Sequence, residues 1–170
     1  MKLWTKMRIS KDKYYLEIAK VVALRSPCLR RKYGAVIVKE DVILSTGYNG
    51  SARGVINCLE VGCIKDILSL PHGKAYNECI AVHAEENAIL NAARSGSCVF
   101  SSTLYLAGFD GNQKIVSAIP CQRCKRAIIN AGISKVVILK DTGEIEEIDV
   151  KEWIKEDTQN YLEKIKTHKV

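Results

Sequence analysis

The sequence lacks any long hydrophobic run. No apolar stretch in its 170 residues is long enough to span a membrane, and the segment 1–15 lacks the apolar centre of a signal peptide. We therefore expect a cytoplasmic protein. Aromatic residues are scarce too, at 6% against 47% hydrophobic residues in all, so the core should be aliphatic. Because no repeat, low-complexity tract or linker interrupts the chain, we expect residues 1–170 to form a single domain.

The sequence also has no extended block of one charge. The net charge is +7, from 26 basic and 19 acidic residues, but the basic residues are scattered, and Arg30-Arg31-Lys32 is their one short cluster. A basic protein attracts either nucleic acid or small phosphorylated molecules. The composition leaves both open.

Disulfides are not expected in a reducing compartment, yet the chain contains seven cysteines. The number is odd, which also argues against a complete set of disulfide pairs. Metal binding explains this cysteine content better.

Two short segments carry a zinc-ligand pattern. One contains His83 and Glu85, and the other contains Cys121 and Cys124, preceded by Pro120. A catalytic zinc keeps three protein ligands and leaves its fourth position to water, so one histidine and two cysteines make a suitable set. The two cysteines are three residues apart, on one face of the first turn of a helix that the proline can begin. Glu85 would then lie near the metal without being a ligand.

Each half of this pattern also has a simpler interpretation. A Cys-x-x-Cys pair alone could be half of a structural zinc site or a redox pair, and a lone His-x-Glu carries little information. A closed structural site, completed by a fourth cysteine, would leave Glu85 without a task. Since both halves occur together, each with a helical pattern after it, we favour a catalytic zinc.

Strand and helix patterns alternate along the chain, which predicts an α/β fold with helices on both faces of a mixed sheet. Hydrophobic periodicity and cap residues predict helices over 10–26, 84–94, 121–131 and from Asp149 onward, and strands over 33–38, 42–46, 103–107, 133–139 and 144–148. A long loop, with a short helix at 64–70, separates the second strand from the helix at 84. Such a loop is unusual in a compact domain unless something holds it.

These motifs resemble those of the cytidine deaminase-like superfamily, and within it the deoxycytidylate (dCMP) deaminases. The similarity extends from about Tyr14 to Leu139, and it is carried by HAEENAI, PCQRC and the segments 26–38, 45–58, 103–108 and 127–139. It implies a three-layer α/β/α fold with a mixed sheet of about five strands. The sequence GYNG followed by Gly-x-x-x-Cys is more typical of dCMP deaminases than of tRNA-adenosine deaminases.

The resemblance implies hydrolytic deamination of dCMP to dUMP and ammonia, a step of pyrimidine nucleotide metabolism. His83, Cys121 and Cys124 would hold Zn²⁺, which lowers the pKa of water. Glu85 would be the catalytic residue that carries a proton from the water to N3 of the pyrimidine, and then to the leaving ammonia.

The same resemblance suggests substrate contacts. The backbone at Ala84 would meet the base edge and Asn49 the sugar. Asn49 could instead be an ordinary residue of an Asn-Gly turn, but we favour the contact with the sugar. The backbone from Gly50 to Gly54 and the side chain of Arg53 are candidates for the 5′-phosphate. An exposed arginine at position 53 could instead be merely solvated.

Four further cysteines could form a second, structural zinc site: Cys28, Cys58, Cys63 and Cys79. In some dCMP deaminases the cysteines that match Cys28 and Cys58 hold such a metal, and four thiolates would anchor the long loop. His72 could replace Cys63 or Cys79. The alternative is that these cysteines are small buried apolar residues; Cys98 we expect either in the core or at the surface.

The segment 109–118 departs from the family pattern, which passes almost directly from the strand to the Pro-Cys motif. The insertion could reshape the pocket, so deoxycytidine, dCTP or a modified nucleotide stay open as substrates. Two further function classes stay open, a deaminase of tRNA or single-stranded DNA and a non-catalytic zinc module, although we do not favour nucleic acid as a partner. Many relatives are homo-oligomers regulated by dCTP and dTTP, and we expect the same here.

Overall fold

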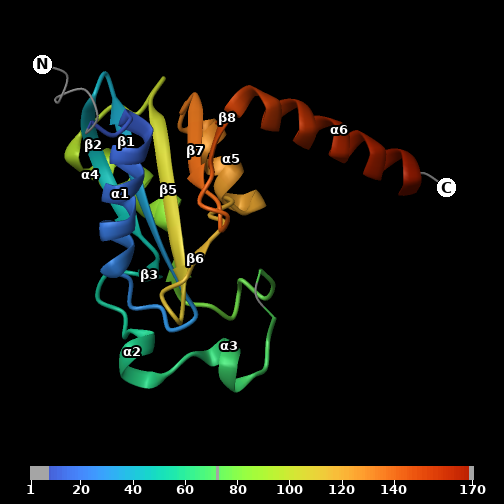
Figure 1. The fold of residues 1–170 in the computed structure, drawn as a ribbon. Coiled ribbons are helices and arrows are strands. Elements are labelled where there is room, and N and C mark those ends of the chain that lie inside the picture. The colour runs from blue at the N-terminus through green and yellow to red at the C-terminus, as the bar shows by residue number, and fades with distance from the viewer. Residues whose placement is uncertain (1–7, 72, 169–170) are drawn as a thin grey trace, which may run out of the picture.

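A mixed β-sheet forms the centre of the computed structural model, which describes residues 8–71 and 73–168 (Figure 1). The strand order is β2-β1-β5-β7-β8, and a short strand, β6, pairs with the C-terminal end of β5. The strands are β1 (Arg31–Lys39), β2 (Val42–Tyr48), β5 (Thr103–Asp110), β6 (Ile115–Val116), β7 (Lys135–Leu139) and β8 (Ile145–Asp149). β5 and β7 pair in parallel and the other neighbours are antiparallel, so the predicted mixed sheet is confirmed.

Helices cover both faces of this sheet. Helix α1 (Lys11–Leu24) lies on one face, and helices α4 (Ala84–Ser95) and α5 (Gln122–Asn130) lie on the other (Figure 1). Alternate residues of β1 divide between the two layers: Val36 joins the cluster under α1, and Ile37 joins the cluster under α4 and α5. Both clusters are mainly aliphatic, as the composition predicts.

Glycine lets two helices approach the sheet very closely. A Cβ atom at Gly34 would lie 2.1 Å from the backbone oxygen of Ala19 in α1, and one at Gly47 would lie 2.2 Å from the backbone nitrogen of Ala88 in α4. The helices therefore pack directly on the backbone of β1 and β2. This contact sets the depth at which the N-terminus of α4 sits.

The last helix, α6 (Val150–His168), leaves the body of the molecule (Figure 1). Asp149 caps it, as predicted, by accepting a hydrogen bond from the Lys151 N–H at 2.9 Å. Val150 and Trp153 are buried in the core. Four other large apolar residues of the helix are exposed: Ile154, Tyr161, Leu162 and Ile165. A search of the described helices finds none with the length and apolar character needed to cross a membrane.

The long loop contains more structure than the sequence predicts. It holds helices α2 (Cys58–Val61) and α3 (Ile64–Ile67), and its ends pair as β3 (Gly50–Ser51) with β4 (Ala81–Val82). The predicted helix at 64–70 begins where expected but is shorter, because Ser69 adopts a left-handed conformation with φ 52°.

The insertion at 109–118 is a β-hairpin. β5 runs to Asp110 and the chain returns as β6. The Asp110 carboxylate accepts hydrogen bonds from the N–H groups of Asn112 and Lys114, both at 2.9 Å, which closes the turn.

Candidate active site

His83 stands at the N-terminus of α4, as its N-cap residue. Its backbone N–H donates to the Glu86 carboxylate at 3.2 Å, so the first turn of the helix holds the histidine in place. Glu86 also accepts from Arg123 of α5 at 2.8 Å. This ion pair joins the two helices that carry the predicted zinc ligands.

Cys121 and Cys124 reach the same point from α5. Cys121 is the N-cap residue, with φ −69° and ψ 165°, and Cys124 is buried in the first turn. Pro120 therefore precedes the cap and lies outside the helix, so its predicted place at the first helical position is wrong. The prediction that both thiols lie on one side of the helix start is confirmed, because both face His83.

The three side chains have the spacing that zinc requires. The His83 Nδ1 atom lies 3.5 Å from the Cys121 sulfur and 3.3 Å from the Cys124 sulfur, and all three ligand atoms fall within 4.8 Å of one another. Tetrahedral zinc, with its usual bond lengths to nitrogen and sulfur, separates such atoms by about 3.5 Å. The residues therefore fit a zinc ion with three protein ligands.

Glu85 points into the same region and is only 5% exposed. Burial raises the pKa of its carboxyl group to about 6, although the nearby His83 acts in the opposite direction. A carboxyl with a pKa near 6 exchanges protons readily at neutral pH.

The two thiols differ in acidity. A hydrogen bond from Cys124 lowers the pKa of Cys121 to about 3, and His83 contributes to this shift. The same hydrogen bond raises the pKa of Cys124, as does its burial. The site thus already favours one thiolate, the form that binds a metal. A hydrogen bond with Cys121 raises the pKa of His83.

A cavity of about 130 Å³ opens beside these residues. His83, Ala84, Glu85 and Cys121 line one part of it, and residues of the long loop line another. No residue of the hairpin at 109–118 is among the described lining residues, so the hairpin does not form the wall of this cavity.

Asn49 and Gly50 also line the cavity. The Asn49 amide is already engaged: its oxygen accepts from the Tyr33 N–H at 2.7 Å and its nitrogen donates to the Arg31 carbonyl at 2.9 Å. Asn49 therefore ties the end of β2 to the start of β1. A Cβ atom at Gly50 would lie 2.8 Å from Pro27, so this part of the wall tolerates no side chain.

Arg53 does not line the cavity. Its guanidinium donates to the Asn91 side chain at 2.8 Å, on the exposed surface of α4. The structure thus does not bring this predicted phosphate donor to the site.

Other cationic side chains lie at the cavity wall in place of Arg53. Arg30, Arg31 and Lys65 all line the cavity. Arg30 pairs with Asp66 at 3.3 Å and donates to the Leu70 carbonyl at 3.0 Å, which holds the long loop over the cavity. The basic cluster at 30–32 could have indicated the two arginines as cavity residues. No feature of the neighbouring sequence distinguishes Lys65 from the other lysines.

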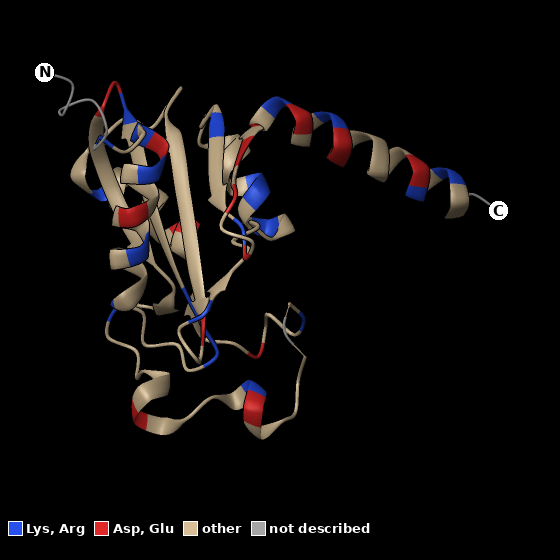
Figure 2. Ribbon diagram, in the orientation of Figure 1, with Lys and Arg blue, Asp and Glu red and all other residues tan. Residues whose placement is uncertain are grey.

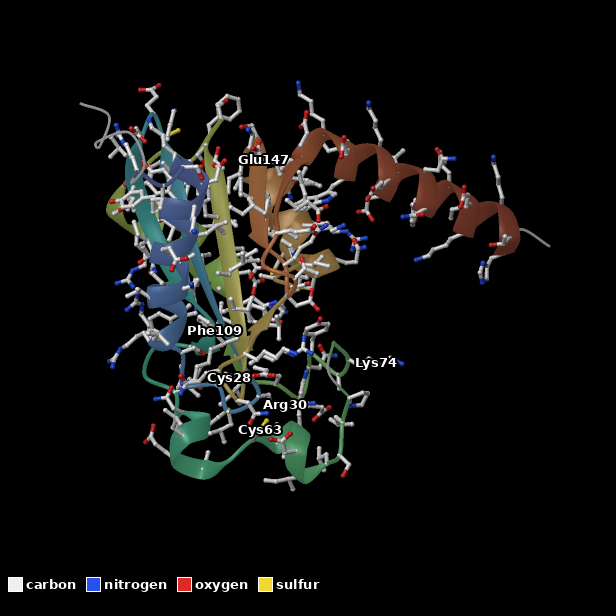
Figure 3. The ribbon with its side chains drawn as sticks, viewed as in Figure 1. Cys28, Arg30, Cys63, Lys74, Phe109 and Glu147 are labelled. Atoms are coloured by element: carbon white, nitrogen blue, oxygen red, sulfur yellow. The ribbon has the colours of Figure 1, made fainter. Side chains whose placement is uncertain are left out.

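The four remaining loop cysteines lie around the same cavity: Cys28, Cys58, Cys63 and Cys79. Figure 3 shows Cys28 and Cys63 with Arg30 at one end of the molecule. Burial, followed by the nearby thiols of the other three, raises the pKa of Cys58. Within residues 8–71 and 73–168, only the His83, Cys121 and Cys124 set is compact enough to be a metal group. Cys98 is exposed, and the suggested His72 ligand lies outside the described residues.

The chain resembles known proteins across this site. Residues 9–140 match the family described as the cytidine and deoxycytidylate deaminase zinc-binding region. The deoxycytidylate deaminase of Schizosaccharomyces pombe is 37% identical over 134 residues, which are 78% of this chain and 38% of the yeast protein. The deoxycytidylate deaminase of Mycobacterium phage D29 is 35% identical over 136 residues, which are 77% of this chain and 95% of the phage protein. The chain thus spans well under half the length of the yeast relative but nearly all of the phage relative.

A solved structure shares the fold. The dCMP deaminase of cyanophage S-TIM5, in complex with dCMP and dUMP, superposes with a TM-score of 0.55 at 27% identity, over 76% of this chain and 81% of that chain. The family match covers the three-ligand set and Glu85 together, in the fold that the solved structure has. The chain therefore belongs to the cytidine and deoxycytidylate deaminase family.

Proposed function

We propose that the protein is a zinc-dependent hydrolase that converts dCMP and water to dUMP and ammonia. The observation that carries this proposal is the position of Glu85, a buried carboxyl with a raised pKa beside a three-ligand zinc set, at one wall of a cavity. A closed structural zinc site would need no such carboxyl. The names of the relatives, deoxycytidylate deaminases of yeast and phage, support dCMP as the substrate.

The residues of the chain have defined tasks in this reaction. A zinc ion held by His83, Cys121 and Cys124 would supply hydroxide at neutral pH, because it lowers the pKa of water. Glu85 takes the proton of the water and delivers it to N3 of the cytosine, while the oxygen bonds to C4. Glu85 then takes the second proton from the hydroxyl that is now on C4 and passes it to the amino group. The C4–N bond breaks as the C4 carbonyl forms, and ammonia leaves. The atoms balance as dCMP plus water on one side and dUMP plus ammonia on the other.

The cavity wall supports three substrate contacts. We assign the base edge to the backbone at Ala84 and the sugar to the region of Asn49 and Gly50, all of which line the cavity. The Asn49 amide already serves the backbone with one N–H and one lone pair of its oxygen. Its second N–H and second lone pair remain for the sugar.

Ammonia release from a panel of substrates tests the proposal. The panel is dCMP, CMP, deoxycytidine, dCTP and a tRNA anticodon stem, with the zinc content measured on the same sample. We expect turnover of dCMP above all others, and none with the Glu85→Ala variant, which should keep its zinc. Turnover of only the RNA, or of nothing in a zinc-loaded sample, would overturn the assignment.

We also propose a second, structural zinc held by Cys28, Cys58, Cys63 and Cys79. The gathering of all four around one end of the cavity supports it. Zinc binding would draw the loop segments together, because metal binding is coupled to the folding of such loops. Metal analysis should find two zinc ions per chain, and one in a Cys58→Ser, Cys63→Ser double variant. A single zinc in the parent protein would refute this proposal.

We infer that the protein is a homo-oligomer regulated by dCTP and dTTP. The exposed apolar residues of α6 support self-association: Ile154, Tyr161, Leu162 and Ile165. Light scattering of the eluting protein, with and without each nucleotide, should give a mass above that of one chain. A monomer at all concentrations would contradict this inference.

A further inference from the structure

Lys65 is a cavity residue that the mechanism above leaves without a task. It lies in α3, on the long loop, and is only 7% exposed. Its side chain lines the cavity, where the ammonium donates to the Lys74 carbonyl at 2.7 Å and lies 5.1 Å from the centre of the Tyr76 ring. No carboxylate of the described chain forms an ion pair with it.

A buried ammonium without a carboxylate is an uncommon arrangement. Lysine is almost never buried unless it is paired, because removing its charge from water is costly. One carbonyl and one aromatic face compensate only part of this cost, and among the described residues two of the three N–H donors have no partner. An anion bound in the cavity would complete the site.

The ammonium and one of the zinc ligands share a neighbour. The centre of the Tyr76 ring lies 5.1 Å from the ammonium and 5.3 Å from the centre of the His83 ring. Lys65 is therefore no farther from His83 than the sum of these distances. Both residues line the same cavity, so one nucleotide can reach His83 with its base and Lys65 with its phosphate.

Two other lining residues point to a polar ligand. The Ser51 hydroxyl is buried in the cavity wall and makes no hydrogen bond within the described part of the chain. Buried hydroxyls are nearly always paired, so a ligand or a water must serve it. The Arg31 guanidinium touches the Tyr33 hydroxyl at 3.4 Å and, in the described residues, forms no ion pair. Arg30, by contrast, is already paired with Asp66.

We propose that Lys65 binds the 5′-phosphate of the nucleotide and so makes the protein prefer a nucleoside monophosphate to the nucleoside. The identity of the base in this inference rests on the proposed deaminase function. Lys65 does not touch the reacting atoms, so it determines specificity through binding and leaves the chemical step to Glu85.

Equilibrium binding of dUMP and deoxyuridine to the zinc-loaded, full-length protein tests this role. Lys65→Met removes the charge and keeps most of the side-chain volume, and Lys65→Arg keeps the charge. We expect Lys65→Met to weaken dUMP binding about ten- to a hundredfold, the usual effect of losing a charge-assisted hydrogen bond, and to leave deoxyuridine binding unchanged. Lys65→Arg should retain most of the preference for dUMP.

Two further variants serve as matched controls. Lys74→Met removes the same charge from the same loop, where the side chain points outward (Figure 3), and keeps the backbone carbonyl. Arg53→Met removes the phosphate donor that the sequence alone suggests. Both should keep the parent ratio of dUMP to deoxyuridine affinity.

Several results would overturn the inference. One is that Lys65→Met binds dUMP as tightly as the parent, or binds dUMP and deoxyuridine equally more weakly. Another is that Arg53→Met, and not Lys65→Met, weakens dUMP binding. The third is that the parent does not bind dUMP. The deaminase proposal is tested separately by ammonia release from dCMP. A parent protein that binds dUMP through Lys65 but releases no ammonia would refute the deaminase function alone. Ammonia release with binding that does not depend on Lys65 would refute the phosphate role alone.

Discussion

At the scale of single residues, the burial of Glu85 affects both chemistry and stability. Its pKa is raised from 4.5 to about 6, chiefly by burial. In the metal-free protein, the folded state therefore holds this proton more tightly than the unfolded chain does. Burial of Glu85 costs no stability below pH 4.5, costs progressively more as the pH rises to about 6, and has its full effect above that.

The first prediction concerns Glu85→Gln. The zinc-loaded variant should bind zinc but release no ammonia from dCMP. The metal-free variant should be more stable than the parent at pH 7 by about 2 kcal/mol, the free energy that corresponds to a pKa rise from 4.5 to about 6, and equally stable at pH 4. Urea unfolding at both pH values measures the difference. Glu163→Gln, at an exposed position of α6, is the control and should change neither property.

The second prediction concerns Asn49, which is 8% exposed and bonded to the backbone at Tyr33 and Arg31. Asn49→Ala should lower the free energy of unfolding by about 2 kcal/mol, because it leaves an N–H and a carbonyl of β1 unpaired. Asn87→Ala removes one exposed bond, to the Tyr48 carbonyl, and should cost less. Weaker dUMP binding should accompany the loss in Asn49→Ala, because the sugar is assigned to the same residue. Parent stability in Asn49→Ala would contradict the structural role.

At the scale of elements, α4 positions the site through close packing. Ala84, Ala88 and Ala92 are fully buried, and the sheet beneath them offers Gly47, so backbone meets backbone. Helix α5 is then held against α4 by the Arg123–Glu86 pair. These contacts position the site residues. They place His83 and Glu85 at the start of α4 near the two cysteines at the start of α5.

The third prediction follows from that packing. In Gly47→Ala the new Cβ would lie 2.2 Å from the Ala88 nitrogen and 2.4 Å from the Ala84 oxygen, which are backbone atoms that cannot move alone. We expect a loss of about 3 kcal/mol in the free energy of unfolding, together with weaker zinc binding. Gly111→Ala is the control, since its nearest neighbour is the Leu29 oxygen at 3.3 Å. If Gly47→Ala unfolded like the parent, α4 could not lie as close to β2 as described.

At the scale of the whole molecule, cohesion comes from the two apolar clusters and not from charge. Figure 2 shows Lys and Arg interleaved with Asp and Glu on α1 and α6. Half of the ion pairs among the described residues join two well-exposed side chains, and such pairs contribute little. This interleaving also disfavours a continuous basic surface for nucleic acid.

The fourth prediction is that zinc stabilises the whole fold, because its ligands come from two helices. Removing the metal with a chelator at pH 7 should abolish ammonia release. It should also lower the free energy of unfolding by about 4 kcal/mol relative to protein with free zinc at a thousand times its dissociation constant. Calorimetric unfolding before and after chelation measures the shift, and Zn²⁺ but not Mg²⁺ should restore both properties. An unfolding temperature that is the same in verified metal-free protein would contradict it.

The sequence by itself determined the alternation of strands and helices, the caps at Ser10 and Asp149, and the ligand set of His83, Cys121 and Cys124. These features depend on spacing along the chain. The period of apolar residues predicts the helices and strands, the residue before a helix predicts its cap, and a separation of three residues places two thiols on one side of a helix start. Local rules of this kind can be read before any contact between distant segments is known.

Only the tertiary structure decided which side chains of the irregular segments reach the cavity. Arg53 donates a hydrogen bond to Asn91 and does not line the cavity. The hairpin at 109–118 also lies outside the cavity wall, whereas Lys65 is part of it. The direction of each side chain depends on its contacts: Arg53 with Asn91, which is 38 residues away, and Lys65 with Lys74 and Tyr76 of its own loop. A loop has no repeating geometry that would indicate such directions, so they follow from the contacts that hold it on the rest of the fold.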